Sequence, residues 1–218
     1  TRTDWGEGWS LATPLAQVDG VGLLSGNGSN AMFGPIAVLG STSVSNPPRF
    51  VIIGSSSAFG SNETFATLPA PGDRGYLSRL VSNNYGQCVL ACGSQTITQF
   101  NTANAIRMAA IAAIGPSHII NQMGANDISG GATAATVQSR LQTMWATLAS
   151  TGAKIIQVTY SPTSTSTDGW TTVGNQTPTG ATVRHAVNDY IRTLPSPISA
   201  VLDVQRVTES STDSGRWR

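Results

Sequence analysis

Residues 117–160 have the sequence SHIINQMGANDISGGATAATVQSRLQTMWATLASTGAKIIQVTY. Two apolar runs without polar alternation, SHIINQM (117–123) and KIIQVTY (154–160), flank a segment of helical periodicity. In that segment, 134–150, apolar side chains recur at i, i+4, i+8 and i+11: Val137, Leu141, Trp145 and Leu148. Strands without alternation, joined by an amphipathic helix, predict a parallel pair buried on both faces.

The same pattern extends in both directions along the chain. Further strands are predicted at FVII (50–53), CVLAC (88–92) and AVLDV (200–204), and further helices at 73–84, 101–114 and 182–194. The order βαβαβαβαβ predicts a three-layer α/β/α domain with a five-stranded parallel sheet, flavodoxin-like, with right-handed crossovers.

The length of 218 residues fits one large domain with a short appendage. Residues 1–48 lack helical periodicity and end at Pro47-Pro48, which predicts an irregular or β extension packed on a main domain of residues 49–218. The stretch 161–180 has no predicted structure and is long for a compact domain, so a functional or mobile loop is expected there.

Charge is scarce: charged residues make up 11% of the chain, against about 25% in an average domain, and the net charge is +1. The few basic residues are scattered, which argues against a nucleic-acid-binding protein. No apolar run is long enough to span a membrane. A surface rich in Ser, Thr and Gly is common on secreted and virion-associated proteins, so an extracellular or virion-associated location is expected.

The two cysteines, Cys88 and Cys92, lie in one predicted strand. Their Cα atoms would be about 13 Å apart there, too far for a disulfide. We expect both to be small core residues. No second cysteine pair or histidine cluster accompanies them, and nothing in the sequence indicates a metal or an organic cofactor.

Ligands of an open parallel sheet bind beyond the carboxyl ends of its strands. Three predicted strands end there in small or polar turns: GSSSAFG (54–60), CGSQT (92–96) and GANDI (124–128). A serine on such a turn exposes its Oγ, and glycine N–H groups and an amide side chain can stabilise a developing oxyanion. The three turns are therefore expected to meet at one edge of the sheet.

These turns resemble the blocks of the SGNH (GDSL-type) hydrolase superfamily. The first block, G-D-S-x-x-x-G, aligns with Gly54 to Gly60 and places Ser56 at the nucleophile position, with Ser55 replacing the family aspartate. The block-two glycine matches Gly93, and G-x-N-D matches Gly124 to Asp127. The resemblance covers residues 49–204. It implies an oxyanion hole formed by the N–H groups of Ser56 and Gly93 and the amide of Asn126.

Each of these residues also has a structural interpretation. Ser56 could cap the following helix, Gly93 could serve the turn, and Asn126 could form an Asx-turn. Asp127 is expected to brace its loop through backbone hydrogen bonds. Trp170, in the long loop after the fourth strand, is a candidate substrate contact or a packing residue.

The general base is the missing part. The family takes it from a D-x-x-H motif after the last strand, and this sequence has no such motif. Of the two histidines, His118 begins its strand at the wrong end, about 26 Å from the site along the strand, and His185 lies off the apolar stripe of its helix and is expected to face solvent. We expect a catalytic His and Asp beyond residue 218 or on a separate C-terminal fragment.

The resemblance implies a serine esterase acting on a small ester substrate, with acylated carbohydrate and lipid both open. The alternative is a catalytically inactive binding or structural module on a virion or cell surface, which the absent histidine favours. Acyl transfer to an acceptor other than water is a third possibility.

Overall fold

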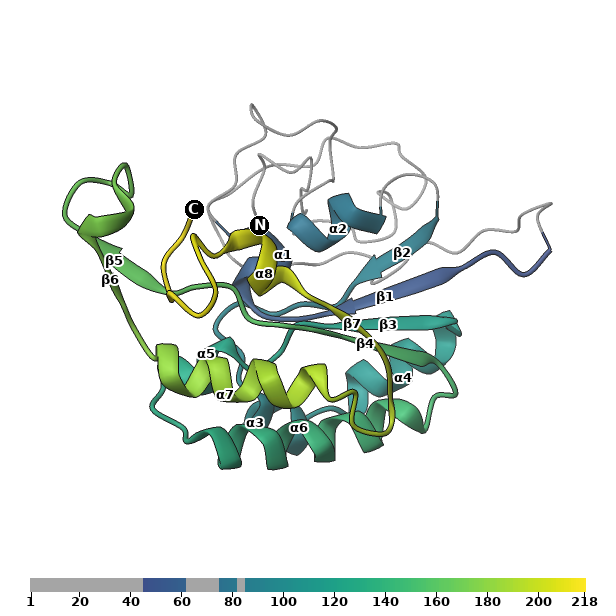
Figure 1. Ribbon diagram of the computed structural model, residues 1–218. Coiled ribbons are helices and arrows are strands. Elements are labelled where there is room, and N and C mark those ends of the chain that lie inside the picture. The colour runs from purple at the N-terminus through teal and green to yellow at the C-terminus, as the bar shows by residue number, and fades with distance from the viewer. Residues whose placement is uncertain (1–44, 62–74, 82–84) are drawn as a thin grey trace, which may run out of the picture.

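The computed structural model describes residues 45–61, 75–81 and 85–218. Five parallel strands form the central sheet in the order β2-β1-β3-β4-β7. Their bounds are Arg49–Ile53 (β1), Gly86–Val89 (β2), His118–Asn121 (β3), Lys154–Val158 (β4) and Ile198–Leu202 (β7). The predicted sheet is confirmed, and helices cover both of its faces (Figure 1).

Described helices pack on both faces of the sheet. One face carries α3 (Ile97–Thr102), α4 (Ala105–Ile114), α6 (Ala134–Ala149) and α7 (Ala181–Arg192). On the opposite face lie α1 (Ser56–Phe59) and α2 (Tyr76–Val81). Figure 1 shows the two groups below and above the sheet, which gives the three predicted layers.

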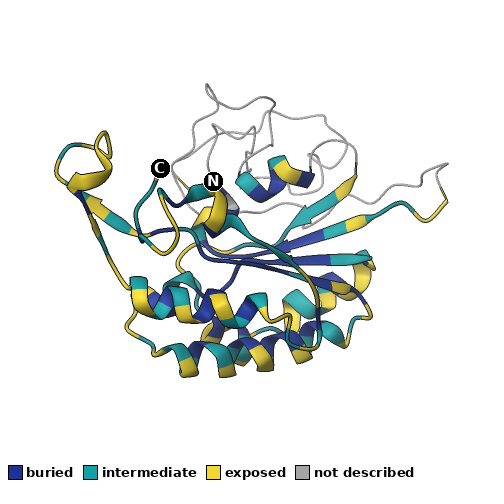
Figure 2. Cartoon of the chain, in the orientation of Figure 1, coloured by how far each residue is buried: buried dark blue, intermediate teal, exposed yellow. Residues whose placement is uncertain are grey.

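Alternate side chains of one strand supply the two cores. Val51 and Ile53 of β1 face the four-helix side, and Ile52 between them faces α1 and α2. All three are fully buried, and each contributes about 2 kcal/mol by its removal from water. Figure 2 shows the strands as a buried band between half-exposed helices. Burial on both faces explains why these runs lack polar alternation.

One predicted helix is broken into two. The segment expected as a helix at 101–114 forms α3 and α4, which begin at Ile97 and Ala105. Thr96 caps α3 through a capping box with Gln99, and this starts the helix four residues earlier than its apolar pattern. Ala103 leaves the helical region, and Asn104 precedes α4.

Several short elements of the described chain were not predicted. The loop 161–180 contains an antiparallel hairpin of β5 (Ser164–Ser166) and β6 (Gln176–Pro178), joined through the 3-10 turn Val173–Asn175. Two single-turn helices, α5 (Ala125–Ser129) and α8 (Val204–Thr208), begin just beyond the carboxyl ends of β3 and β7. Such elements are too short to show a hydrophobic period.

Neither cysteine forms a disulfide, as expected, but the predicted placement of both in the core is partly wrong. Cys88 is half-buried and Cys92 is exposed, because β2 ends at Val89 and Cys92 lies in the turn beyond it. Most of the predicted N-terminal extension, residues 1–44, lies outside the described residues. Among the helices described, none combines the length and the apolar character required to cross a bilayer.

Candidate active site

The turns after β1, β2 and β3 lie at the same edge of the sheet. These strands are neighbours, with β1 between β2 and β3. Backbone hydrogen bonds continue beyond them, from Cys92 N to Gly54 O at 3.0 Å and from Gln122 N to Ile53 O at 2.8 Å. The fold therefore gathers the three sequence blocks that carry the family resemblance at its carboxyl edge.

Ser56 is the first residue of α1, and its side chain is half-buried. Within the described part of the chain, its hydroxyl has no hydrogen-bond partner. Its possible role as a helix cap is wrong, because Ser55 occupies the N-cap position in extended conformation and makes no side-chain cap bond. No described hydrogen bond therefore holds the Ser56 Oγ at the start of α1.

Gln122 holds the serines on either side of Ser56. Its Oε1 accepts from the Ser55 N–H at 3.2 Å, and its Nε2 donates to Ser57 Oγ at 2.9 Å. A side chain at Gly54 would collide with Ala58 Cβ and approach Gln122 Oε1 to 2.9 Å, so this turn requires glycine. Gln122 was not predicted. The signal for it was a pair of adjacent amides, Asn121 and Gln122, at the end of a largely apolar run and shortly before the third block.

Gly93 lies exposed in the turn after β2, and a Cβ there would meet no atom within 4 Å. Its N–H has no hydrogen-bond partner among the residues described. The described residues would therefore tolerate a side chain at this position.

Asn126 lies in α5 and links the second turn to the third. Its Nδ2 donates to the backbone oxygen of Gln95 at 2.9 Å. An amide nitrogen carries two hydrogens, so one N–H remains for another acceptor. The structure thus ties the Asn126 amide to the loop that holds Gly93.

Asp127 braces this region, as the sequence predicted. Its buried carboxylate accepts from the Ile97 N–H at 2.8 Å and from Arg140 Nη1 at 2.8 Å. A buried carboxylate needs such partners to offset its desolvation. It fixes the start of α3 and the α6 surface against α5, and it is not available as a base.

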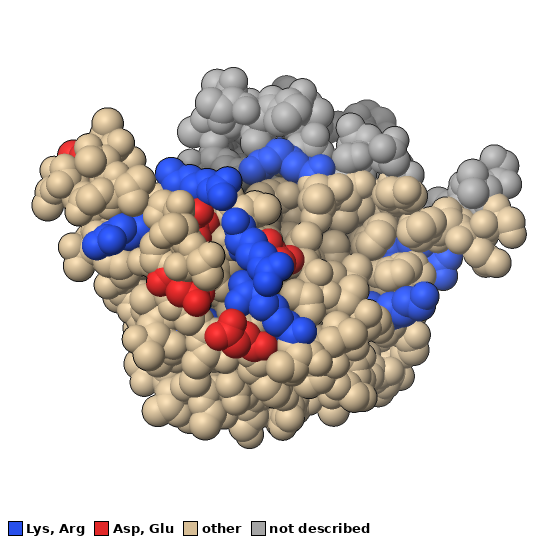
Figure 3. All heavy atoms as spheres, in the orientation of Figure 1, with Lys and Arg blue, Asp and Glu red and all other residues tan. Residues whose placement is uncertain are grey.

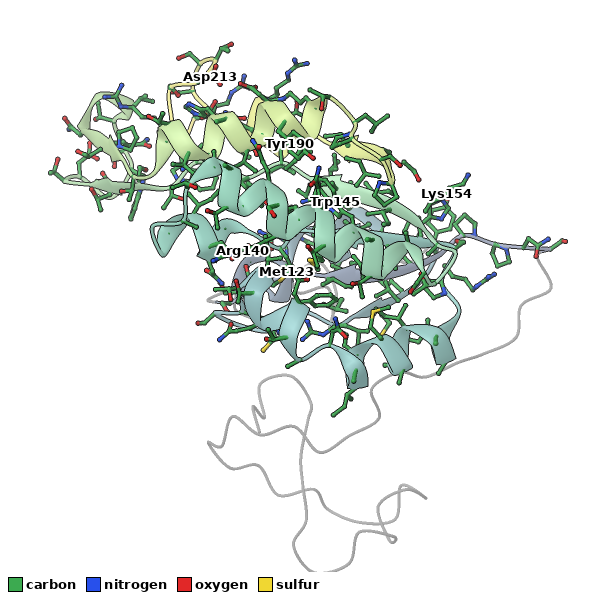
Figure 4. The ribbon with its side chains drawn as sticks, turned by 90° about the horizontal axis from the view of Figure 1, so that it is seen from below. Met123, Arg140, Trp145, Lys154, Tyr190 and Asp213 are labelled. Carbon is green, nitrogen blue, oxygen red and sulfur yellow. The ribbon has the colours of Figure 1, made fainter. Side chains whose placement is uncertain are left out.

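A buried amide network supports the third turn from inside. Gln157 Oε1 accepts from Asn121 Nδ2 and from Trp145 Nε1, both at 2.8 Å. Asn121 Oδ1 in turn accepts from Met123 N at 3.2 Å. The Trp145 ring stacks on Tyr190 of α7, with centroids 6.1 Å apart (Figure 4). These contacts connect the outer helices to the residue that precedes Gly124.

His118 begins β3 opposite Phe50, whereas Asn121 ends the strand on the site side. The His118 ring stacks on Phe50 with ring centroids 5.2 Å apart, and His118 Nδ1 lies 2.9 Å from Ser117 Oγ. Burial, aided by the charge of Lys154, lowers the pKa of the His118 imidazole. Its predicted position at the far end of the strand is confirmed.

The expectation that His185 faces solvent is wrong. Its Nε2 lies 3.0 Å from Glu209 Oε1, and its side chain is 16% exposed. The chain after α8 folds back over α7 and buries Glu209. The helical periodicity of 182–194 gives no information about this later segment, so the contact could not be predicted from it. Neither histidine forms a hydrogen bond with Ser56 in the described structure.

Glu209 is the centre of a small polar cluster. Besides His185, its carboxylate accepts from Gly215 N, Asp213 N and Gln205 Nε2, at 2.9 to 3.1 Å. Ligand-type atoms of His185, Glu209 and Asp213 lie within 4.8 Å of one another. The carboxylate is already satisfied by four donors, so its evident role is to anchor the C-terminal segment on α7.

Trp170 lies on the β5–β6 hairpin, which follows β4 and projects beyond the carboxyl edge, at the left of Figure 1. The indole is 52% exposed. The packing interpretation of Trp170 is therefore not supported, although no described interaction joins it to the three turns.

Comparison with known proteins agrees with this geometry. The model of the GDSL-like Lipase/Acylhydrolase family matches residues 52–213. No curated protein matches the chain.

Solved structures with the same fold include three bacterial proteins. A G-D-S-L family lipolytic protein from Veillonella parvula is 18% identical with a TM-score of 0.53, and the match covers 72% of this chain and 78% of that one. A putative acylhydrolase from Bacteroides fragilis is 20% identical (TM-score 0.51; coverage 77% and 73%). A putative G-D-S-L lipolytic protein from Desulfitobacterium hafniense is 18% identical (TM-score 0.54; coverage 76% and 82%).

Proposed function

The chain belongs to the GDSL-like lipase/acylhydrolase family, and from that premise we propose that it hydrolyses carboxylic esters with Ser56 as the nucleophile. The observation that carries the proposal is the state of the three serines in the first turn. Ser55 and Ser57 are held by Gln122, whereas the Ser56 hydroxyl between them is unbonded in the described structure.

In the proposed reaction, Ser56 Oγ attacks the ester carbonyl and its proton passes to a general base. The carbonyl π electrons move onto oxygen, where the N–H groups of Ser56 and Gly93 and the Asn126 amide stabilise the negative charge. The alcohol leaves with a proton as the acyl-serine forms. Water then attacks the acyl carbon, and the carboxylic acid and free Ser56 are released.

The base is assigned to neither described histidine. His118 lies at the amino end of β3, and the Nε2 of His185 is engaged with Glu209. A histidine carried beyond residue 218 or on a separate fragment fits this part of the proposal. The substrate is proposed to be a small acyl ester, and the charge-poor sequence gives no reason to expect a strongly charged one.

Replacing His185 by alanine is expected to leave turnover of p-nitrophenyl acetate within about threefold of the parent protein and to cost about 1–2 kcal/mol of stability. The loss follows because buried Glu209 would lose one of its hydrogen-bond partners. Urea unfolding and initial rates measure the two effects, and His118→Ala serves as the matched histidine deletion. A fall in kcat of a hundredfold or more in His185→Ala would identify His185 as the base and contradict this assignment.

Replacing Asn126 by alanine is expected to lower kcat by about a hundredfold, as loss of one oxyanion donor does in other hydrolases. Asn101→Ala is the matched control, because Asn101 also donates one amide hydrogen across elements, to Arg140 O at 3.1 Å. Both variants lose one such bond, so similar stability with a kcat loss confined to Asn126→Ala would support the donor role. Equal kcat in the two variants would remove Asn126 from the oxyanion hole.

The lack of a histidine at Ser56 favours a second candidate, a binding module that keeps the fold without turnover. A fluorophosphonate probe separates the two. Covalent labelling of the peptide that contains Ser56 supports the esterase. No labelling, together with no turnover of p-nitrophenyl acetate by the full-length protein, supports the binding module.

A further inference from the structure

The β5–β6 hairpin presents an uncovered aromatic side chain. Trp170 is 52% exposed and Val173 38% exposed, and both lie in the loop that joins the two strands. The hairpin stands away from the body of the domain, and its surface is largely exposed (Figures 1 and 2). A large indole on a projecting arm contributes little to the core. Its exposed face is available for contact with a ligand.

The loop of this arm is tightly organised around Asp168. Its Oδ1 accepts from Ser166 Oγ at 2.7 Å, and its Oδ2 accepts from Thr172 N and from Asn175 Nδ2, each at 2.9 Å. Hydrogen bonds from Ser166, Asn175 and Thr172 lower the pKa of Asp168 to about 2. The carboxylate therefore stays ionised above about pH 3, and it accepts hydrogen bonds from residues of its own loop.

The base of the arm is also fixed. Gln176 exchanges two hydrogen bonds with the backbone of Trp217, at 2.8 and 3.1 Å, and Arg216 Nε donates to Gln176 O at 3.0 Å. Thr179 N donates to Thr163 O at 2.8 Å. The arm is thus clamped to the C-terminal segment and presents its tip in a defined position.

The indole is held in one orientation at a conformational cost. Trp170 N donates to Ser166 Oγ at 2.8 Å, and its Nε1 donates to Ser164 Oγ at 3.1 Å. Its φ of +63° lies in the left-handed region, which Gly or Asn adopts far more easily than a bulky residue. A strained residue whose side chain stays in water is typical of binding sites, where the strain is offset by function.

The surroundings of the ring define what it can bind. Between Ser164 and Pro178, Asp168 is the sole charged residue. The exposed polar side chains are the amide of Asn175, which donates to Asp168, and the hydroxyls of Thr165, Thr167, Thr171, Thr172 and Thr177. Figure 3 shows the charged groups of this face gathered mainly over the central C-terminal region, with the arm largely uncharged. Phosphate-bearing ligands need cations, and a lipid surface needs a wider apolar face with basic flanks.

We propose that the β5–β6 arm binds a neutral polysaccharide, with a sugar ring stacked on Trp170 and its hydroxyls bonded to the surrounding threonines. The exposed indole supplies an apolar face, and the neighbouring threonines supply hydroxyl donors and acceptors. The arm follows β4 at the same edge of the sheet as Ser56. The substrate is then an acyl ester carried on that polysaccharide, a conclusion that rests on the proposed function, whereas binding by the arm does not.

Affinity electrophoresis of the full protein through native gels containing xylan, barley β-glucan, galactomannan or dextran tests the binding. We expect at least one polymer to retard the protein. Trp170→Asn should weaken retardation at least about tenfold in apparent Kd, while Trp170→Tyr and Val173→Ala should stay within about threefold. Trp170→Asn should also keep or raise the melting temperature, by up to about 2 °C, because asparagine accepts the left-handed backbone.

Three results would overturn the proposal: no retardation by any of the four polymers, equal retardation of the parent and Trp170→Asn, or retardation by anionic hyaluronan alone. The Ser56→Ala variant keeps the two proposals apart. It should lose ester turnover and retain retardation. A parent protein that is retarded by a polymer but shows no ester turnover would count against the esterase alone. On acetylated forms of the bound polymer, Trp170→Asn should raise KM about tenfold with kcat unchanged.

Discussion

Ser56→Ala is expected to lower kcat for p-nitrophenyl acetate by at least about 10³-fold, because removal of a serine nucleophile leaves only binding and oxyanion stabilisation. The fold should be unaffected. Ser56 is half-buried and its hydroxyl bonds to no described group, so its loss leaves no buried donor or acceptor unpaired. Initial rates and a thermal melt on the same preparations measure both effects.

Ser57→Ala is the matched control. Its hydroxyl is adjacent in sequence and accepts a hydrogen bond from Gln122 Nε2 at 2.9 Å, yet it has no place in the proposed chemistry. We expect Ser57→Ala to retain activity within about tenfold. A fluorophosphonate should add one mass increment to the peptide containing residues 55–57 in the parent and in Ser57→Ala, and none in Ser56→Ala. Retained turnover in Ser56→Ala, or labelling of another peptide, would end the case for this nucleophile.

The sheet, and the position of the candidate site at its carboxyl edge, could be predicted because both follow from local sequence patterns. Runs such as FVII and KIIQV are apolar on both faces, which fits strands covered by two helical layers. Parallel strands joined by crossovers bring their carboxyl ends to one edge. The sequence therefore predicts that the turns carrying Ser56, Gly93 and Asn126 lie at one edge of the sheet, where the structure has them.

What the sequence could not reveal depends on tertiary contacts. The half-buried state of His185 follows from Glu209, 24 residues away, folding back over α7. The Gln122 side chain reaches across 65 residues to Ser57. Neither contact leaves a periodic trace, because a polar side chain is compatible with several partners far along the chain. The exposure of Cys92 likewise depends on where β2 ends, and strand boundaries are weakly encoded.

Gly124→Ala is expected to destabilise the protein by about 4 kcal/mol, for two reasons that add. The φ of Gly124 is +133°, a conformation essentially restricted to glycine. A Cβ there would also collide with Tyr160 Oη and lie 2.6 Å from its Cζ. Tyr160 cannot move aside without loss, because it is buried and its hydroxyl donates to Met123 O at 2.6 Å.

Two further variants separate these causes. Gly131 has a φ of +85° and open space where its Cβ would lie, so Gly131→Ala carries the backbone strain without the collision and should cost about 1 kcal/mol. Tyr160→Phe removes the hydroxyl that the new methyl would strike. The penalty for Gly124→Ala, measured by urea unfolding, should therefore be smaller in the Tyr160→Phe background, a positive coupling between neighbours.

The same contact links stability to chemistry. Gly124 is the N-cap of α5, the turn that carries Asn126, so an alanine that displaces this turn moves the amide as well as straining the fold. Sub-ångström misplacement of an oxyanion donor is costly, so folded Gly124→Ala should lose kcat, and the Tyr160→Phe background should restore part of it. A Gly124→Ala variant no less stable than Gly131→Ala, with full activity, would show that Tyr160 does not position the third turn.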